Sequence, residues 1–180
     1  RAWFLLIYFG HKNILILNGG LKNWKKSGGE TTVKKTIISK GNFVSKTEQK
    51  DLVVNLEEMI YISKNNSKVI LDARSYKRFI GKAKEPRPAL QSGHIPNSKS
   101  LPSSELLTSD GFLKSIVELD KFFSNNDIDK SQDIVATCGS GVSACVISIA
   151  LYCLGKEHIP IYDGSWTEWA TSGQKIQTGN

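Results

Sequence analysis

The sequence predicts an α/β fold in which a parallel sheet is flanked by helices on both faces. The first observation is an alternation, between residues 53 and 162, of short apolar segments with segments of helical apolar spacing. Such alternation is typical of a parallel sheet that is covered on both sides. The second is a strand-like segment, residues 134–137, that runs directly into a glycine-rich loop and a helix. Active sites of these folds lie where strands end and helices begin, so this loop is the candidate site.

The expected elements follow in chain order. Before the loop we expect a helix over Val53–Ser63, a strand over Val69–Leu71, a helical turn over Ser75–Ile80 and a strand over Ser98–Leu101. A longer helix is amphipathic, and its apolar side comprises Phe112, Ile116, Leu119, Phe122 and Phe123 within Phe112–Asn125. Then come the strand Ile134–Thr137, a helix over Val142–Leu154 that ends at Gly155, and a strand over Ile159–Tyr162.

Two stretches of the chain resemble each other at an offset of 145 residues, Phe9–Gly28 and Leu154–Gly173. Both patterns predict a helix end, a short apolar strand, an Asn-Gly or Asp-Gly turn and a short helix anchored by Trp. Trp24 in the first stretch corresponds to Trp169 in the second. Internal repeats indicate duplicated structural units. We therefore expect residues 1–28 to be the tail of a first domain, residues 29–51 a linker, and residues 52–180 a complete second domain.

Positive charge is concentrated at the start of the chain. Residues 1–50 carry ten Lys and Arg against two Glu, whereas residues 51–180 carry fourteen Lys and Arg against fifteen Asp and Glu. A nucleic-acid-binding protein concentrates basic residues on its folded domain. We therefore interpret the basic stretch as a solvated linker and expect no nucleic acid as partner. The apolar runs are too short to span a bilayer, so no membrane association is expected.

The three cysteines are Cys138, Cys145 and Cys153. An odd number without a paired framework favours free thiols in a reducing compartment, which indicates the cytoplasm. Cys145 and Cys153 follow on one apolar helix, so we expect both to fill the core. The sequence has no close pair of cysteines of the kind that binds zinc, and we expect no metal and no cofactor.

Cys138 differs from the other two because it ends a strand and begins the glycine-rich loop. The loop residues that follow it are Gly139, Ser140, Gly141, Val142 and Ser143. Two glycines let the backbone curl tightly and turn its N–H groups inward, and the helix N-terminus adds partial positive charge. Both effects stabilise a thiolate, the reactive form of cysteine. Cys138 is therefore the predicted nucleophile.

Several other polar or aromatic residues are interpreted as structural. His94 lies in a turn before a strand, and Asp72 with Arg74 forms an expected hydrogen-bonded pair at a strand end. Trp166 and Trp169 are expected to anchor the core, and two further histidines, His11 and His158, to be exposed.

The segment CGSGVSAC, residues 138–145, resembles the active-site loop of the 3-mercaptopyruvate sulfurtransferases of the rhodanese superfamily. Three further segments resemble landmarks of that family, namely LDAR at 71–74, SGHIPNS at 92–98 and YDGSWTEW at 162–169. The resemblance implies a rhodanese-like domain that carries the active Cys, preceded by the tail of a first such domain. Ser143 stands where the family usually has Thr, which keeps the hydroxyl.

The same resemblance separates the subtypes of the superfamily. Thiosulfate sulfurtransferases carry basic residues where this chain has Gly139 and Ser140, and the related phosphatase loops carry Arg where it has Ala144. Arg residues in the contexts of Arg78 and Arg87 bind the substrate carboxylate in the mercaptopyruvate enzymes. An Arg guanidinium can hold a carboxylate through two parallel hydrogen bonds. The resemblance therefore implies a mercaptopyruvate donor and argues against phosphatase chemistry.

The implied reaction has two halves. Cys138 first takes the sulfur of 3-mercaptopyruvate as a persulfide and releases pyruvate, while loop N–H groups stabilise charge and Ser140 relays a proton. A thiol, such as that of thioredoxin, or cyanide then accepts the sulfur. In the family, a His and an Asp of the first domain support the loop, and they would precede residue 1. Two alternatives stay open, a thiosulfate sulfurtransferase and a rhodanese-like module that binds a partner without catalysis.

Overall fold

The computed structural model describes residues 1–45 and 48–179. Its five-stranded sheet has the order β1-β5-β4-β2-β3, and all neighbouring strands are parallel. The strands are β1 (Val53–Val54), β2 (Val69–Asp72), β3 (Ser98–Ser100), β4 (Ile134–Thr137) and β5 (Ile161–Tyr162). The predicted α/β class with a parallel sheet is confirmed.

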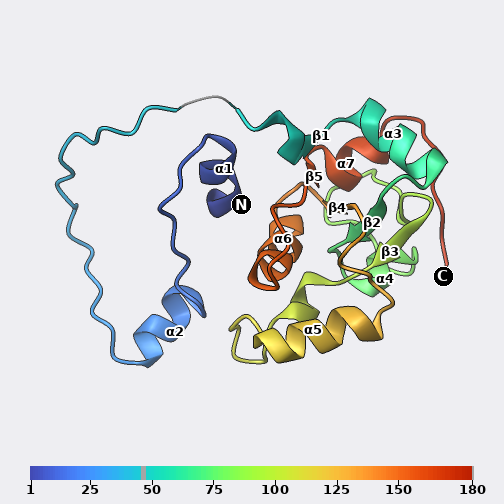
Figure 1. Cartoon of the computed structure of the whole chain (residues 1–180). Coiled ribbons are helices and arrows are strands. Elements are labelled where there is room, and N and C mark those ends of the chain that lie inside the picture. The colour runs from blue at the N-terminus through green and yellow to red at the C-terminus, as the bar shows by residue number, and fades with distance from the viewer. Residues whose placement is uncertain (46–47, 180) are drawn as a thin grey trace.

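Helices cover both faces of the sheet (Figure 1). On one face lie α5 (Ile116–Asn125) and α6 (Ala144–Cys153), and on the other lie α3 (Leu56–Asn65) and α7 (Ser165–Trp169). Strand side chains alternate between the two layers: Leu71 and Ala136 pack toward α6, whereas Ile70 and Val135 pack toward α3 and α7. Short elements complete the domain, namely α4 (Tyr76–Phe79) and the 3₁₀ helices η1 (Lys50–Leu52) and η2 (Ser103–Leu106).

Two helix starts differ from the prediction, because capping residues set them. The predicted helix over Val53–Ser63 is divided at Asn55, whose side chain accepts the N–H of Glu58 and begins α3. The two β-branched residues before it form β1 and pair with β5. Similarly, a capping box of Ser115 and Glu118 begins α5 at Ile116.

The buried face of α5 is therefore narrower than the apolar side that the sequence predicts. Leu119 and Phe123 are fully buried, whereas Phe112 lies before the helix and is 38% exposed. Ile116 occupies the first turn and is 53% exposed. Because the helix starts four residues later than predicted, the first two apolar residues of the pattern do not share its buried face.

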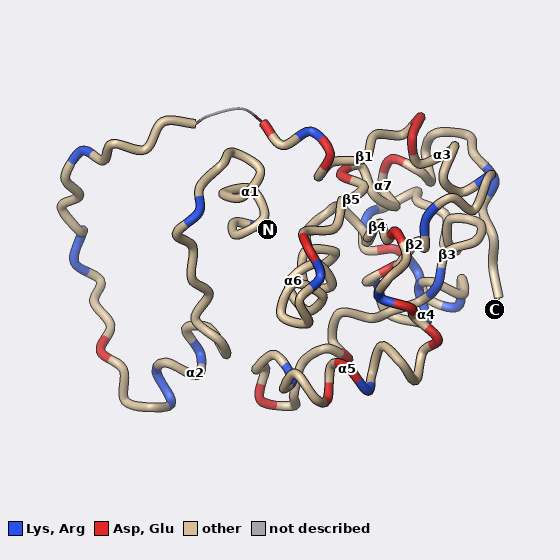
Figure 2. Tube along the Cα trace, in the orientation of Figure 1, with Lys and Arg blue, Asp and Glu red and all other residues tan. Residues whose placement is uncertain are grey.

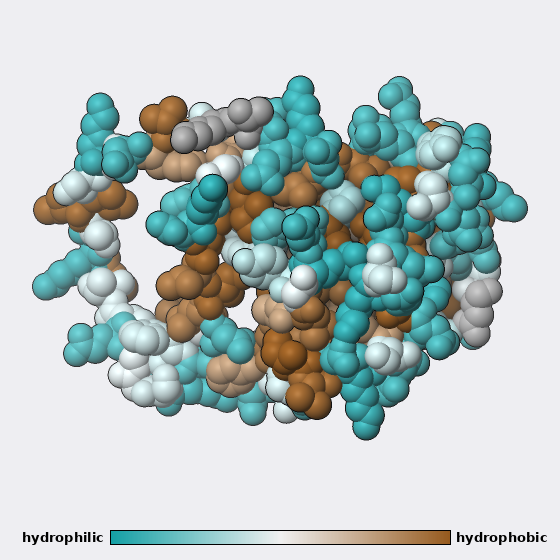
Figure 3. Space-filling view, viewed as in Figure 1, coloured by the Kyte–Doolittle hydropathy of each residue, from teal (hydrophilic) through white to brown (hydrophobic). Residues whose placement is uncertain are grey.

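The N-terminal segment contains α1 (Ala2–Tyr8) and α2 (Gly20–Lys26). The apolar stretch Ile14–Leu17, which the repeat predicts as a strand, has no strand partner among the described residues and is irregular. Trp24 is 42% exposed, so it does not anchor a core as Trp169 does. Figure 3 shows apolar side chains on the surface of this segment.

The predicted linker, residues 29–51, has no regular structure between residue 29 and residue 45. Residues 29–45 run as a wide loop after α2, and Figure 2 shows basic residues along α2 and this loop. Lys46 and Thr47 of the linker, and Asn180 at the end of the predicted second domain, lie outside the described residues. The division into tail, linker and second domain stays a prediction.

Candidate active site

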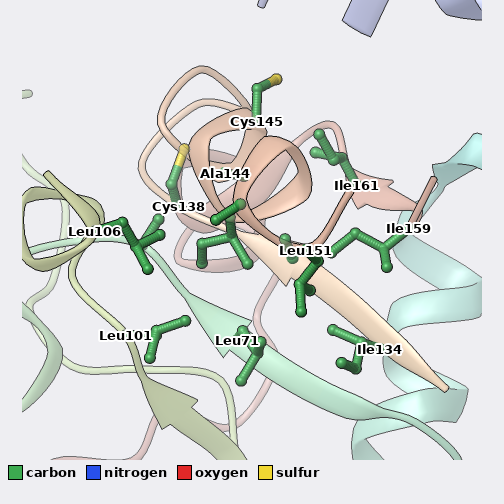
Figure 4. Packing of buried hydrophobic residues seen from close by; sticks show 14 of the residues in the cluster. Leu71, Leu101, Leu106, Ile134, Cys138, Ala144, Cys145, Leu151, Ile159 and Ile161 are labelled. Carbon is green, nitrogen blue, oxygen red and sulfur yellow. The ribbon is translucent and has the colours of Figure 1, made fainter. Parts of the chain in front are cut away.

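The carboxyl end of β4 places Cys138 in a pocket of about 490 Å³. Figure 4 shows the sulfur of Cys138 beside the start of α6, pointing away from the core residues Leu71 and Leu101. The residues that line this pocket with it are Arg78, Glu85, Pro86, Arg87, Leu90, Gly139, Ser140, Val142 and Ser143. The structure thus brings together all but one of the residues predicted from the sequence. The exception is Gly141, which is buried within the loop and does not line the pocket.

The Cys138 thiol is 1% exposed, and burial acts to raise its pKa. Hydrogen bonds to the sulfur act in the opposite direction. They come from the hydroxyl of Ser143 and from the backbone N–H groups of Ala144, Ser140 and Ser143. Together they hold the pKa of Cys138 below its ordinary value. The loop therefore favours the thiolate, since donors aimed at an anion stabilise it.

The first residues of α7 hold this loop in place. The buried hydroxyl of Ser165 accepts the N–H groups of Cys138 and Gly141, at 3.3 and 2.9 Å, and donates to the carbonyl of Tyr162. The N–H of Trp166 donates to the carbonyl of Cys138 at 2.9 Å. Thr167 binds the carbonyl of Gly139 through both its N–H and its hydroxyl. No role was predicted for Ser165 or Thr167, although both lie in the segment 162–169 that resembles a landmark of the family.

Both glycines of the loop occupy positions where a side chain would be obstructed. Gly141 has φ of +69°, and a Cβ there would lie 3.0 Å from the carbonyl oxygen of Asp163. At Gly139 a Cβ would lie 3.1 Å from Nη2 of Arg78. Gly139 therefore leaves room for the guanidinium of Arg78 above the loop.

The two predicted arginines differ in their partners. Arg78 donates through Nε and Nη2 to the two carboxylate oxygens of Glu85, with 3.2 Å for the Nε bond. Arg87 is exposed and donates through Nη1 to the hydroxyl of Thr167 at 2.5 Å. Among the described residues no carboxylate forms an ion pair with Arg87. Glu85 thus neutralises the positive charge of Arg78, whereas the charge of Arg87 has no carboxylate partner among the described residues.

Behind Glu85 lies a buried ion pair. Arg74 donates to both oxygens of Asp72 through Nε and to Asp72 Oδ2 through Nη2, and its Nη1 donates to Glu85 at 2.9 Å. Its guanidinium lies 4.3 Å above the ring of Trp166. The structural interpretation of Asp72 and Arg74 is therefore confirmed. Glu85 was missed, although its place two residues before Arg87 was a usable signal.

The remaining structural interpretations are mostly confirmed. Trp166 and Trp169 are buried, and His94 is buried with Nδ1 2.9 Å from the carbonyl oxygen of Phe79. The exposure predicted for His11 and His158 is wrong, because both are half-buried. His158 stacks on Tyr152 with a centroid distance of 4.8 Å, and His11 stacks on Phe43.

One of the two structural cysteines is also corrected. Cys145 is buried as predicted, but Cys153 is exposed. Eight residues on an α-helix turn a side chain by about 80° relative to the first. The side chain at the end of α6 consequently leaves the buried face.

Within residues 1–45 and 48–179, no three His, Cys, Asp or Glu side chains lie where they could hold a metal ion. Within the same ranges, no helix has the length and apolar character needed to cross a bilayer.

The chain and its fold are similar to known proteins. The rhodanese-like domain family matches residues 55–172. Thiosulfate/3-mercaptopyruvate sulfurtransferase 1, mitochondrial, from Arabidopsis thaliana is 38% identical over 95% of this chain and 50% of its own length. Thiosulfate sulfurtransferase from Cricetulus griseus is 37% identical over 94% of the chain and 57% of its own length. The chain thus spans about half the length of these relatives.

A solved structure is similar over the same region. SseA from Escherichia coli, described as a 3-mercaptopyruvate sulfotransferase with the rhodanese fold, superposes with a TM-score of 0.79 at 33% identity. The match covers 92% of this chain and 61% of that one. With its parallel sheet, its Cys138 loop and this match over most of its length, the chain belongs to the rhodanese-like domain family.

Proposed function

We propose that this chain is a sulfurtransferase domain that moves sulfur from 3-mercaptopyruvate through a persulfide on Cys138. The observation that carries the proposal is the buried thiol of Cys138, which four hydrogen bonds hold toward the thiolate inside a pocket lined by two arginines. A nucleophile of lowered pKa beside groups that bind anions is the arrangement needed to attack an anionic sulfur donor. The names of the relatives and of the similar structure support the same chemistry.

In the first half-reaction the thiolate of Cys138 attacks the sulfur of 3-mercaptopyruvate. The new S–S bond forms as the C–S bond of the donor breaks, and the electron pair of that bond leaves on pyruvate as its enolate. Arg87 and Arg78 hold the donor carboxylate, and the N–H groups of Ser140 and Ser143 stabilise the sulfur anion. Ser140, whose side chain is exposed at the pocket, relays the proton from the donor thiol to the enolate carbon.

In the second half-reaction an acceptor removes the outer sulfur. Cyanide forms a bond to that sulfur and leaves as thiocyanate, whereas a thiolate, such as that of thioredoxin, becomes a persulfide. In both cases the S–S bond breaks and its electron pair returns to Cys138 as the thiolate. The same four hydrogen bonds stabilise this leaving thiolate. The cytoplasm is the compartment that we propose, although the Arabidopsis relative is named as mitochondrial.

Thiosulfate is the second candidate donor, and the name of the Cricetulus relative favours it. Thiosulfate carries two negative charges, so a site for it benefits from additional cations near the nucleophile. The residues directly after Cys138 are neutral in this chain, and Arg78 is already paired with Glu85. These features favour the donor with a single carboxylate.

The proposal is tested by incubating the chain with each donor and measuring its intact mass. We expect the mass of one sulfur atom to be gained from 3-mercaptopyruvate, to map to Cys138, and to be lost on addition of cyanide. The Cys138→Ser variant is the control and gains none. A wild-type chain that folds but gains no sulfur from either donor would contradict the proposal, and a chain loaded only by thiosulfate would favour the second candidate.

A further inference from the structure

We infer that Glu85 is a specificity-determining positioning residue, which sets the net charge of the donor pocket by neutralising Arg78. The inference rests on the proposed function, because the pocket in question is the one that contains Cys138. Apart from the Cys138 thiolate itself, three charged residues line that pocket, Arg78, Arg87 and Glu85. Their formal charges leave a single positive charge, which matches a donor with one carboxylate.

The geometry explains why Glu85 stays in this position. Its side chain is 2% exposed, and Arg74, whose side chain is fully buried, donates to it from behind. Arg74 is in turn paired with Asp72 at a distance of 2.7 Å. Charges therefore alternate in sign from Asp72 through Arg74 and Glu85 to Arg78. The series is neutral as a whole, so it contributes no net charge to the pocket.

Arg78 is the end of this series that faces the pocket. Its side chain is 23% exposed, and its Nη2 lies above Gly139 next to the nucleophile. Two of its donors are committed to Glu85, so the guanidinium serves as a positioned hydrogen-bond donor and not as an unpaired charge. Arg87, which contacts the neutral hydroxyl of Thr167, supplies the remaining positive charge.

Removing the charge of Glu85 should therefore favour a donor with two negative charges. The Glu85→Gln variant keeps the shape and an oxygen that can accept from Arg74, but it leaves Arg78 unpaired. For a second charge on the donor, one added cation a few ångströms away strengthens binding by about tenfold. We expect the ratio of kcat/KM for thiosulfate to that for 3-mercaptopyruvate to rise about tenfold, and less at high salt.

Two further variants separate charge from structure. Arg78→Gln lowers the pocket charge and should lower the ratio. The double variant Arg78→Gln with Glu85→Gln has the net charge of the wild type and should restore the ratio to within about twofold of it. A residue that only stabilises the fold would lower both rates together and leave the ratio unchanged. If Glu85→Gln does not fold, Arg78→Gln alone still tests the inference, because it leaves the charge of Glu85 in the pocket without Arg78 to offset it and should lower the ratio below that of the wild type.

Equal ratios in Arg78→Gln and the double variant, or an unchanged ratio in folded Glu85→Gln, overturn the inference. A wild-type chain that forms no persulfide contradicts the proposed function instead. In that case the inference is decided by binding, with pyruvate and sulfate as probes in calorimetric titrations of the same variants. Glu85→Gln should then tighten the binding of sulfate more than that of pyruvate, and equal changes for the two probes would again overturn the inference.

Discussion

Burial and hydrogen bonding act in opposite directions on the pKa of Cys138. Burial alone would hold the thiol neutral, but the Ser143 hydroxyl and three backbone N–H groups reverse the balance. The three backbone donors come with the shape of the loop, whereas the hydroxyl depends on one side chain. A substitution at Ser143 therefore changes the pKa of Cys138 while the three backbone donors stay in place.

The first prediction concerns the Ser143→Ala variant. The hydroxyl stabilises the thiolate, so its loss should raise the pKa of Cys138 and leave less thiolate at neutral pH. We expect alkylation of Cys138 by iodoacetamide to slow by about tenfold at neutral pH and to recover at higher pH. Peptide mass spectrometry separates this signal from that of the exposed Cys153. Thr171→Ala is the control, and a pH profile equal to that of the wild type would contradict the assignment of Ser143.

The second prediction compares two glycines with similar backbone conformation. Gly141 and Gly155 have φ of +69° and +82°, so alanine is strained at both, at a cost of about 1 kcal/mol. Only Gly141 also brings the new methyl group against a backbone carbonyl, because nothing lies within 4 Å of a Cβ at Gly155. Gly141→Ala should therefore lose about 1–3 kcal/mol more stability in urea denaturation than Gly155→Ala. Equal losses would show that strain in φ, and not the close approach, requires the glycine.

Residues of the site differ in how far the sequence predicts them. Cys138 and the loop were found because a strand, two glycines and a helix start are visible in the chain order. Thr167 was not, because it acts on residues far away in the sequence, whereas Glu85 lies only seven residues from Arg78 and was overlooked. Thr167 reaches Gly139 and Arg87 across separations of 28 and 80 residues. Such contacts follow from the packing of β4 beside β5, which no local pattern encodes.

At the scale of elements, α7 supports the loop that contains Cys138. Its first residue, Ser165, has φ of +52° and no exposed surface, and its hydroxyl makes three hydrogen bonds to the loop and to β5. A non-glycine residue in this conformation is costly. The hydroxyl offsets this cost, because it accepts hydrogen bonds from two buried N–H groups that lie outside any helix or strand.

The third prediction follows for the Ser165→Ala variant. Without the hydroxyl, the N–H groups of Cys138 and Gly141 are left unpaired in a buried position. We expect a loss of about 2–4 kcal/mol in the free energy of unfolding. Ser172→Ala removes a half-buried hydroxyl that donates to Trp169 at the other end of the same helix, and it should cost about 1 kcal/mol. If both variants lose the same stability, α7 does not support the loop as described.

Helix and strand assignments from the sequence located the elements but misplaced the starts of two helices. Ile134–Thr137 was predicted with its observed bounds, since Asp133 precedes it and the glycine-rich loop begins directly after it at Cys138. The starts of α3 and α5 were misplaced, because Asn55 and Ser115 end the preceding segment through their side chains. A capping box can be recognised in a sequence, but the spacing of apolar residues alone does not reveal where it begins a helix.

At the scale of the whole molecule, α1 joins the core of the rhodanese-like domain. Phe4 and Ile7 are buried in the same cluster as Ile147 and Leu151 of α6, and the ring of Trp3 packs edge-on against Tyr152. The internal repeat predicts that residues 1–28 derive from another domain. Whatever their origin, the first eight residues contribute to the stability of the domain that carries Cys138.

The last prediction tests this contribution through a pair of phenylalanines. Phe4→Ala removes a ring that is 1% exposed in the core, and such truncations cost about 3–5 kcal/mol. Phe43→Ala makes the same chemical change in the linker, where the ring is 52% exposed and stacks on His11, and it should cost less than about 1 kcal/mol. Urea denaturation followed by tryptophan fluorescence measures both. Since α1 and α6 share one cluster, Phe4→Ala should shift a single transition, and a separate early transition would mean that α1 unfolds independently of the domain.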